Sequence, residues 1–580
     1  MSQLQLKDAE TDQPVDWQNA QVYQNGFPSH LQQEFEIEDL KLSQTLFYIS
    51  PHSAIITSRI TNTSSEKTEL HPHWKGKLFP IGARIESGDK GIGITFSKSP
   101  SRGVVQALGS EILNTSTTDS TYDLRLEIIE LAPGESRELI LAHGFYFPPT
   151  NWAEEQSRIG RAADDPTRFL EDRINEKKAQ LTGLCDRLDS SRMDTAYRDL
   201  LVKTVLTLQN NWRSPAGELT HSGLFPSYHQ KWFHGYWAWD SWKHAVALGH
   251  CDPVLAREQI RAMYAFQKED GFIPDCVFRD TTIENHNLRN TKPPLSAWAA
   301  WEVHRQSPDR DFLQELYPKI KKQHQWWYEN RDHDGDRVCE YGSTDGSLVA
   351  AKWESGMDNA VRFDQSQLLE NTANAFSLDQ ESVDLNAYLY AEKKYLALMA
   401  GELGKKEEQD AFAAEAEVLK GKIQEQFFDP VSGWFYDTNL EGGTFVEAMG
   451  CEGWIPLWAE AASPEQAEAV KNNMVNPSTF NTKVPFQTLS ADHPKFKPDR
   501  GYWRGPNWLD QSYFGVRGLR NYGFVAEANE ATYKLIHNAE GVLGKGRSIR
   551  ENYHPITGEG MEAENFSWSA AHYLLLLINE

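Results

Sequence analysis

Two short stretches far apart in the chain carry carboxylates of the kind that general acid–base chemistry needs. In the first, Trp353 and Glu354 precede Gly356 and Asp358, so a glycine bend separates two acids four residues apart. An indole can stack on a sugar ring, and a carboxyl group kept protonated by its surroundings can act as a general acid. The second stretch, residues 550–553, contains Glu551. We predict that Asp358 and Glu551 are the working carboxylates of a carbohydrate site.

A third stretch, residues 232–242, surrounds Asp240 with aromatic side chains. Aromatic faces stack on the C–H faces of a sugar, and an ionised carboxylate accepts hydrogen bonds from vicinal hydroxyls. Rings at this density also fill helical cores. We therefore assign Trp242 to the core, and Trp237, Trp239 and Asp240 to the substrate site.

Two further stretches add cationic candidates. Trp503 and Trp508 bracket Arg504 and the turn at Gly505, and we assign all four residues to the substrate site. An arginine near a carboxylate lowers the pKa of that group and would keep a catalytic base ionised. The alternative is a surface ion pair, which contributes little to stability. Lys292 precedes two prolines that set the approach to a helix, so it either projects into the cleft or is solvated.

Residues 332–340 suggest a cation site. Acidic oxygens recur at alternate positions around a glycine, which suits a hard cation such as Ca²⁺, although the glutamate comes too early for a full EF-hand loop. An acidic turn after a helix is the alternative. No histidine pairs accompany the acids, so we expect a structural and not a catalytic metal. The predicted ligands are Asp332, Asp334, Asp336, Val338 and Glu340.

Bulk properties narrow the partners. The net charge of −25, from 58 basic and 83 acidic residues, argues against nucleic acid or an anionic membrane as the main partner. Five scattered cysteines without paired spacing predict free thiols. The N-terminus lacks a charged segment followed by an apolar run, so we expect a cytoplasmic protein. We also expect a small sugar substrate and no organic cofactor. The oligomeric state stays open.

The periodicity of apolar residues changes along the chain. Residues 1–164 show short alternating strands, including 53–63, 91–98 and 138–147, and predict a β-sandwich. Residues 165–192 predict a helical linker. Residues 193–580 contain roughly a dozen helices with short links, including 309–330 and one that begins at the Asp252 cap and ends at Gly271. Asp194 is a further N-cap. This pattern favours an (α/α)6 toroid with catalytic loops converging on a central funnel.

In order, residues 237–240, 292–294, 354–359, 503–506 and 551–553 resemble the motifs of glycoside hydrolase family 63, which holds bacterial α-glucosidases and mannosylglycerate hydrolases. Trehalases of family 37 share the Glu-Ser-Gly-x-Asp pattern, so this pattern indicates the clan and not one substrate. The resemblance implies inversion of the anomeric configuration, with Asp358 as general acid and Glu551 as general base. The carboxyl groups of such a pair lie roughly 6.5–9.5 Å apart with a water between them.

The resemblance also implies a set of residues that hold the −1 sugar. Residues 332–340 resemble a Ca²⁺ loop of some bacterial members, whereas the long insertion that covers the pocket of the bacterial α-glucosidases is missing here. We predict an inverting exo-glycosidase that hydrolyses α-glucosidic bonds of small oligosaccharides or glucosides. The alternatives are a mannosylglycerate, glucosylglycerate or trehalose hydrolase, an inverting phosphorylase, and a non-catalytic sugar-binding protein. The −1 residues implied are Trp239, Asp240, Trp353, Glu354, Trp503 and Arg504.

Overall fold

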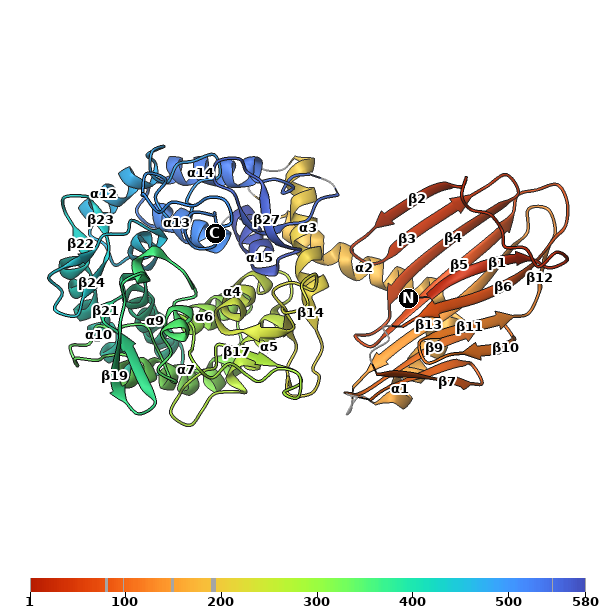
Figure 1. Cartoon of the computed structure of the whole chain (residues 1–580), viewed down its shortest axis with the longest axis horizontal. Helices are drawn as coiled ribbons and strands as arrows, with labels where there is room; N and C mark the ends of the chain where they lie inside the picture. The colour runs from red at the N-terminus through yellow and green to blue at the C-terminus, as the bar shows by residue number, and fades with distance from the viewer. Residues whose placement is uncertain are drawn as a thin grey trace. The chain divides into compact units, whose positions relative to one another are not determined.

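The chain divides into two compact units, Met1–Thr182 and Gly183–Glu580 (Figure 1). The computed structural model describes residues 2–78, 82–97, 99–147, 151–188, 194–544 and 546–578. The helix α2 (Pro166–Cys185) runs past residue 182, and the expected boundary at residue 192 lies outside the described residues. Among the described helices, none combines the length and the apolar character that a membrane span requires.

The first unit contains two antiparallel sheets. One has the order β1-β6-β11-β10, with β12 also paired to β6, and the other has the order β2-β3-β4-β5-β13-β9-β8-β7. The strands are β1 (Ser2–Asp8), β2 (Gln21–Gly26), β3 (Leu31–Glu36), β4 (Leu40–Tyr48), β5 (Ser53–Asn62), β6 (Thr68–Lys77), β7 (Ala83–Gly88), β8 (Gly91–Phe96), β9 (Ser99–Leu108), β10 (Ile112–Thr117), β11 (Thr121–Leu126), β12 (Ile129–Leu131) and β13 (Ser136–Tyr146).

Both sheets contribute alternate side chains to one core. Leu124 and Leu126 of β11 and Leu141 of β13 are buried in the same cluster, as a strand with one buried face predicts. Ile128 does not continue the alternation, because β11 ends at Leu126 and the Ile128 side chain is 46% exposed. The helix α1 (Trp152–Asp164) packs Ile159 against β5 and β13 in a second, smaller core.

In the second unit, six helices form a closed series of neighbours. Each contacts the next, and the last contacts the first. The series is α4 (Ala238–Leu248), α6 (Ser296–Gln306), α9 (Val383–Glu402), α11 (Ile455–Ala459), α13 (Leu509–Asn521) and α15 (Ser567–Leu577). The helices outside this series are α3 (Thr195–Asn211), α5 (Pro253–Tyr264), α7 (Arg310–Asn330), α8 (Leu348–Glu354), α10 (Lys406–Gln426), α12 (Pro464–Met474) and α14 (Val525–Asn538).

Burial distinguishes the two groups of helices. Every residue of α4 and α15 is buried, whereas α5 and α10 bury only one face, as expected for helices that cover an inner layer. Asp194 and Asp252 cap α3 and α5 by accepting hydrogen bonds from Tyr197 N and Leu255 N. The predicted end of α5 at Gly271 is wrong, because the helix stops at Tyr264.

Short strand pairs and 3₁₀ turns occupy the connections between these helices. They place chain segments over the first turns of α4, α13 and α15, where Asp240, Asp510 and Trp568 lie. These elements are β14 (Trp212–Arg213), β15 (Gly223–Leu224), β16 (Gly235–Trp237), β17 (Cys276–Phe278), β18 (Gly342–Ser343), η2 (Val361–Phe363), β19 (Leu368–Thr372), β20 (Ala375–Leu378), β21 (Gln380–Glu381), β22 (Phe428–Asp429), β23 (Trp434–Phe435), β24 (Asp437–Asn439), β25 (Phe445–Val446), η3 (Cys451–Trp454), β26 (Arg550–Tyr553) and β27 (Gly560–Glu564).

Candidate active site

Three segments far apart in sequence are joined by two asparagines. The Asn359 side chain donates to Gly501 O (3.2 Å) and accepts from Trp503 N (3.0 Å). Asn507 and Tyr553 exchange backbone hydrogen bonds of 2.8 and 3.0 Å. The segment 501–508 therefore connects the loop that carries the predicted general acid to the strand that carries the predicted general base.

Tyr502 lies at the centre of this arrangement. Its hydroxyl donates to Asp358 Oδ2 at 3.5 Å. Burial raises the pKa of Tyr502, and the charges of Asp358, Glu551 and Asp240 raise it further, so all three carboxyl groups act on one hydroxyl. Tyr502 also has φ of 63°, a left-handed conformation that costs a non-glycine residue about 1–3 kcal/mol. Such strain is typical of functional loops.

The two predicted catalytic carboxyls both bind protons more tightly than in water. Burial raises the pKa of Asp358 to about 6, while Lys292 opposes the shift and Asp275 reinforces it. Burial raises the pKa of Glu551 to about 7, against a hydrogen bond that the carboxylate accepts from Ala563 N at 3.0 Å. Burial therefore brings the titration of both carboxyls close to neutral pH.

Asp240, in the first turn of α4, is suited to binding hydroxyls. Asp240 is buried, and burial raises the pKa of its carboxyl group to about 7. Among the residues that the structure describes, none donates a hydrogen bond to this carboxylate, so its oxygens remain available to a ligand. This arrangement supports the predicted role of Asp240 in binding the sugar.

Lys292 is buried among carboxylates and is not solvated. Its Nζ donates to the Trp353 carbonyl and lies 3.5 Å from Asp275 Oδ1. Burial alone would lower the pKa of Lys292, but Asp275, Asp358 and Asp240 together raise it. The lysine thus supplies one fixed positive charge within the acidic cluster.

Four of the predicted tryptophans form two groups, a buried stacked pair and two partly exposed rings. Trp503 and Trp508 stack on each other, with centroids 4.2 Å apart and an interplanar angle of 6°, and both are buried. Trp237 and Trp353 retain partial exposure. We infer that the stacked pair supports the site from behind, and that the partly exposed rings are the ones available to a sugar.

Trp239 packs directly on the loop of the predicted general acid. Gly356 has φ of +73°, and a Cβ at this position would lie 2.2 Å from the Trp239 ring. Behind Trp239, Lys243 Nζ lies 3.1 Å from the ring centroid and pairs with Asp510 at 2.6 Å, with both charged side chains fully buried. Trp239 is therefore packed between charged and backbone neighbours that leave its ring little freedom to move.

Three residues of the predicted substrate site make structural contacts within the protein. Glu354 makes a bidentate pair with Arg331 (2.7 and 2.9 Å) and accepts from Gly342 N and Thr291 N, so its oxygens are occupied. Arg504 binds Asp364 and the Asn359 carbonyl, and it helps lower the pKa of Asp364 and not that of Glu551. Gly505 has φ of +149°, and its N–H donates to Thr488 Oγ1 at 3.1 Å.

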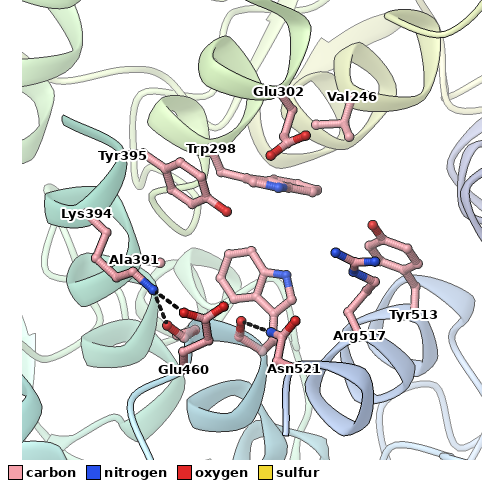
Figure 2. Close-up of a pocket in the computed structure, with 12 residues that line it drawn as sticks. Val246, Trp298, Glu302, Ala391, Lys394, Tyr395, Glu460, Tyr513, Arg517 and Asn521 are labelled. Carbon is pink, nitrogen blue, oxygen red and sulfur yellow. Dashed lines mark hydrogen bonds and ion pairs between the residues drawn. The ribbon is translucent and has the colours of Figure 1, made fainter. Parts of the chain in front are cut away.

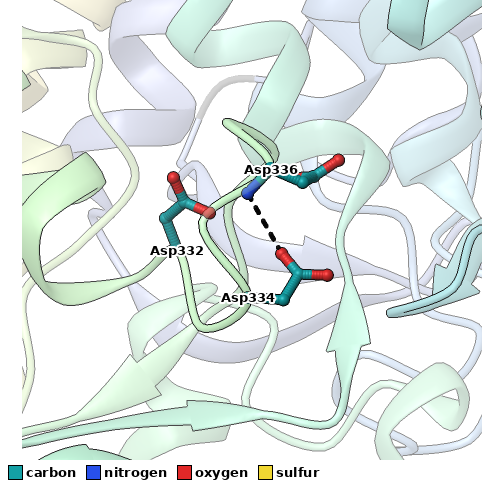
Figure 3. Close-up of side chains that lie close together, drawn as sticks. All are labelled: Asp332, Asp334 and Asp336. Atoms are coloured by element: carbon teal, nitrogen blue, oxygen red, sulfur yellow. Dashed lines mark hydrogen bonds between the residues drawn. The ribbon is translucent and has the colours of Figure 1, made fainter.

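The predicted cation loop brings its acids together (Figure 3). Single carboxylate oxygens of Asp332, Asp334 and Asp336 lie within 4.8 Å of one another. Gly335 and Arg337 have φ of 79° and 73°, which makes the tight bend. Val338 lies in the same loop and donates its N–H to Asp336 Oδ1 at 2.6 Å.

A ligand set at this loop extends to a residue that the sequence analysis missed. Oxygens of Asp334, Glu340 and Glu381 also lie within 4.8 Å of one another. Glu340 and Glu381 are fully buried, yet Oε1 of each has no hydrogen-bond partner among the described residues. Unpaired buried carboxylate oxygens are costly without a cation, so the donor set fits Ca²⁺. Lys422 reaches the cluster only at Asp336, at 2.8 Å.

Sequence reasoning missed other contributors as well. Tyr502 belongs to an aromatic stretch that the sequence marks, but its conformation is not visible in its residue type. Asp275 carries no motif and reaches the site only because β17 pairs with β16. The same holds for Lys243 and Asp510, which meet from two helices of the inner series.

The family match to known proteins lies within the helical unit, Gly183–Glu580. Residues 233–569 match the model of the mannosylglycerate hydrolase MGH1-like glycoside hydrolase domain. A mannosylglycerate hydrolase of Rubrobacter radiotolerans is 24% identical over 64% of this chain and 95% of its own, and mannosylglycerate hydrolase MGH1 of Selaginella moellendorffii is 26% identical over 59% and 80%. The crystal structure of a GH63 mannosylglycerate hydrolase of Thermus thermophilus with Tris and D-glycerate has a TM-score of 0.54 and 22% identity, covering 65% of this chain and 99% of its own.

Proposed function

The chain belongs to the mannosylglycerate hydrolase MGH1-like glycoside hydrolase family, and we propose that it inverts the anomeric configuration, with Asp358 as general acid and Glu551 as general base. The single observation that supports these roles concerns Tyr502, whose hydroxyl donates a hydrogen bond to Asp358 and whose pKa the charge of Glu551 raises. Carboxyls that meet in this way from segments nearly two hundred residues apart suit a reaction that needs two of them.

In the proposed reaction, protonated Asp358 delivers its proton to the glycosidic oxygen while the aglycone leaves. Ionised Glu551 takes a proton from the water that attacks the opposite face of the sugar ring. Asp240 binds sugar hydroxyls, and Trp237 and Trp353 contact the ring faces. The closed series α4-α6-α9-α11-α13-α15 supports the (α/α)6 toroid that holds these groups at one end of its inner helices.

We propose a hexosyl-glycerate as the substrate, in preference to the α-glucosidic oligosaccharide that the sequence analysis put first. The named relatives, mannosylglycerate hydrolases, support this alternative. An α-glucosidase and a trehalase-like activity remain the competing specificities, since the residues around the reacting carboxyls suit any hexose.

A substrate panel tests the assignment. Mannosylglycerate, glucosylglycerate, trehalose, maltose and an aryl α-glucoside are incubated with the protein, and the released anomer is followed by NMR. We expect hydrolysis of a glycosyl-glycerate to be at least tenfold faster in kcat/KM than that of the disaccharides, with inversion. Faster hydrolysis of the disaccharides restores the glucosidase assignment, a retained anomer ends the proposed mechanism, and phosphate-dependent release of a sugar phosphate identifies a phosphorylase.

We also propose a structural Ca²⁺ held by Asp332, Asp334, Asp336, the Val338 carbonyl and Glu340, with Glu381 as an additional ligand. Its chemistry is to neutralise crowded carboxylates and to join the loop after α7 to β21. No pair of histidines accompanies these acids, so we propose a structural and not a catalytic role for the ion.

A further inference from the structure

A polar cavity of about 80 Å³ lies among the helices of the inner series (Figure 2). Its lining comes from α4, α6, α9, α11 and α13, including Val246 near the end of α4 and Arg517 in the second half of α13. Asp240 and Asp510 occupy the first turns of those same two helices. The cavity is therefore separate from the proposed catalytic site.

Hydrogen-bond donors without a partner among the described residues line this cavity. Trp298 and Trp458 are only 4% and 8% exposed, and their rings meet edge to face at 5.6 Å. Among the residues that the structure describes, none accepts a hydrogen bond from either indole N–H or from the Tyr395 hydroxyl. Tyr395 is half-buried, and none of the three donor atoms is fully enclosed by protein, so an acceptor that enters the cavity can pair with each of them. The volume admits several waters or one small molecule.

The charges around the cavity are largely matched by the protein. Lys394 pairs with Glu460 at 2.7 Å, and Glu302 pairs with Arg305 at 2.7 Å (Figure 2 shows the first pair). Figure 2 also shows the Tyr395 hydroxyl and the Glu302 carboxylate directed toward the space between the helices. Matched charges favour a neutral ligand, and convergent N–H and O–H donors favour one rich in oxygen.

We propose that this cavity binds a neutral polyol of three or four carbons. The polyol oxygens accept hydrogen bonds from the Trp298 and Trp458 indoles and from Tyr395, and a polyol hydroxyl donates to Glu302. The C–H groups lie against the two indole rings. The ligand satisfies donors of α6, α9 and α11 together, so its binding links helices of the inner series.

Titration with erythritol, by calorimetry and saturation-transfer NMR, tests this proposal on the full chain. We expect saturable binding at one site that persists in the D358N/E551Q double variant, because the cavity is separate from the catalytic carboxyls. W298F removes one donor and keeps the ring, and A391L fills the space with a larger side chain. Each should weaken binding at least tenfold. W301F on the same helix and A413L on the exposed face of α10 are the matched controls.

Three results would overturn the proposal. The first is erythritol affinity that W298F and A391L leave unchanged, and the second is tighter binding of D-glycerate than of erythritol. The third comes from a crystal of the wild-type protein soaked in erythritol. This experiment tests the binding site even if the variants do not fold. Density for the polyol between Trp298 and Trp458 supports the site, and density for separate waters rejects it. None of these measurements depends on catalytic activity.

Discussion

Two clusters of acidic side chains in the helical unit differ in how their charge is balanced. In the proposed catalytic cluster, the buried ammonium group of Lys292 pairs with Asp275, and the charges of Asp358 and Asp240 also act on it. In the cation loop, oxygens of Glu340 and Glu381 approach each other within 4.8 Å, and each residue keeps one oxygen without a partner among the described residues.

The difference shows that a count of carboxylates does not predict chemistry. Where the chain supplies its own cation, the acids can exchange protons around it and act on a substrate. Where it supplies a cation only at Asp336, through Lys422, the buried Glu340 and Glu381 are left to bind either a proton, since burial raises the pKa of each, or an external ion. This contrast supports the proposed proton chemistry in one cluster and the proposed metal binding in the other.

Replacing the proposed general acid should have the largest effect of the variants considered, and it should affect only the proposed catalytic cluster. D358N should lower kcat/KM by about 10²–10⁴-fold, since the amide delivers no proton to the leaving oxygen. The free energy of unfolding of D358N at pH 8 should not fall below that of the wild type. Burial raises the pKa of Asp358, so its ionised form is unfavourable in the native protein, and the variant removes that charge. E551Q should behave in the same way. Kinetics and thermal unfolding of both variants are compared with D345N, which alters an exposed acid; full activity of D358N would remove Asp358 from the mechanism.

Removal of Ca²⁺ should act on the other cluster alone. At calcium concentrations of 100 to 1,000 times its Kd, bound ion stabilises the fold by about 2.7–4.1 kcal/mol, and a chelator removes that contribution. E381Q should abolish most of the calcium-dependent rise in Tm, whereas D358N should retain it. E370Q, on the neighbouring strand β19, serves as the control. Equal Tm values with calcium and with chelator in the wild type would show that the protein balances this cluster itself.

A variant of Lys292 tests whether its buried positive charge supports catalysis. K292Q should lower kcat/KM by roughly tenfold, the size of effect that a lost charged hydrogen bond produces. The wild-type pH profile should be a narrow bell with limbs near the pKa values of about 6 and about 7. Lys292 lowers the pKa of Asp358, so its removal should move the limb that Asp358 controls to higher pH.

The limb that moves identifies the carboxyl on which Lys292 acts. The pKa of Asp358 lies below that of Glu551, so Asp358 controls the acidic limb and Glu551 the alkaline limb. We expect the acidic limb to move in K292Q, and a shift of the alkaline limb instead would mean that Lys292 acts mainly on Glu551. K231Q, a change on the approach to β16, should leave both limbs in place.

Much of the scaffold was predictable because it depends on local patterns. The predicted helix 309–330 corresponds to Arg310–Asn330 and the predicted strand 53–63 to Ser53–Asn62, since caps and apolar periodicity are local signals. The aromatic stretch before Asp240 and the glycine at position 356 likewise pointed to the site.

The remainder depends on contacts that sequence does not display. Glu354 was predicted to bind sugar, because nothing in its own motif indicates that Arg331 occupies its carboxylate. Glu381 was missed because it joins the cation loop from a separate strand, β21. Asp275 and Lys292 have meaning only as a pair, and a lone aspartate or a lysine before prolines is individually ordinary.

The smallest expected effect concerns Tyr502, which connects the two proposed catalytic carboxyls. Y502F keeps the ring and the left-handed backbone but removes the hydroxyl that donates to Asp358 at 3.5 Å. A bond of that length is weak, so kcat/KM should fall only about threefold to tenfold. The Asp358-controlled limb should move in the same direction as in K292Q but less, because Tyr502 lowers the pKa of Asp358 less than Lys292 does. Y533F on α14 is the control, and a larger shift in Y502F than in K292Q would mean that the hydroxyl, and not the ammonium group, dominates the charge of the catalytic cluster.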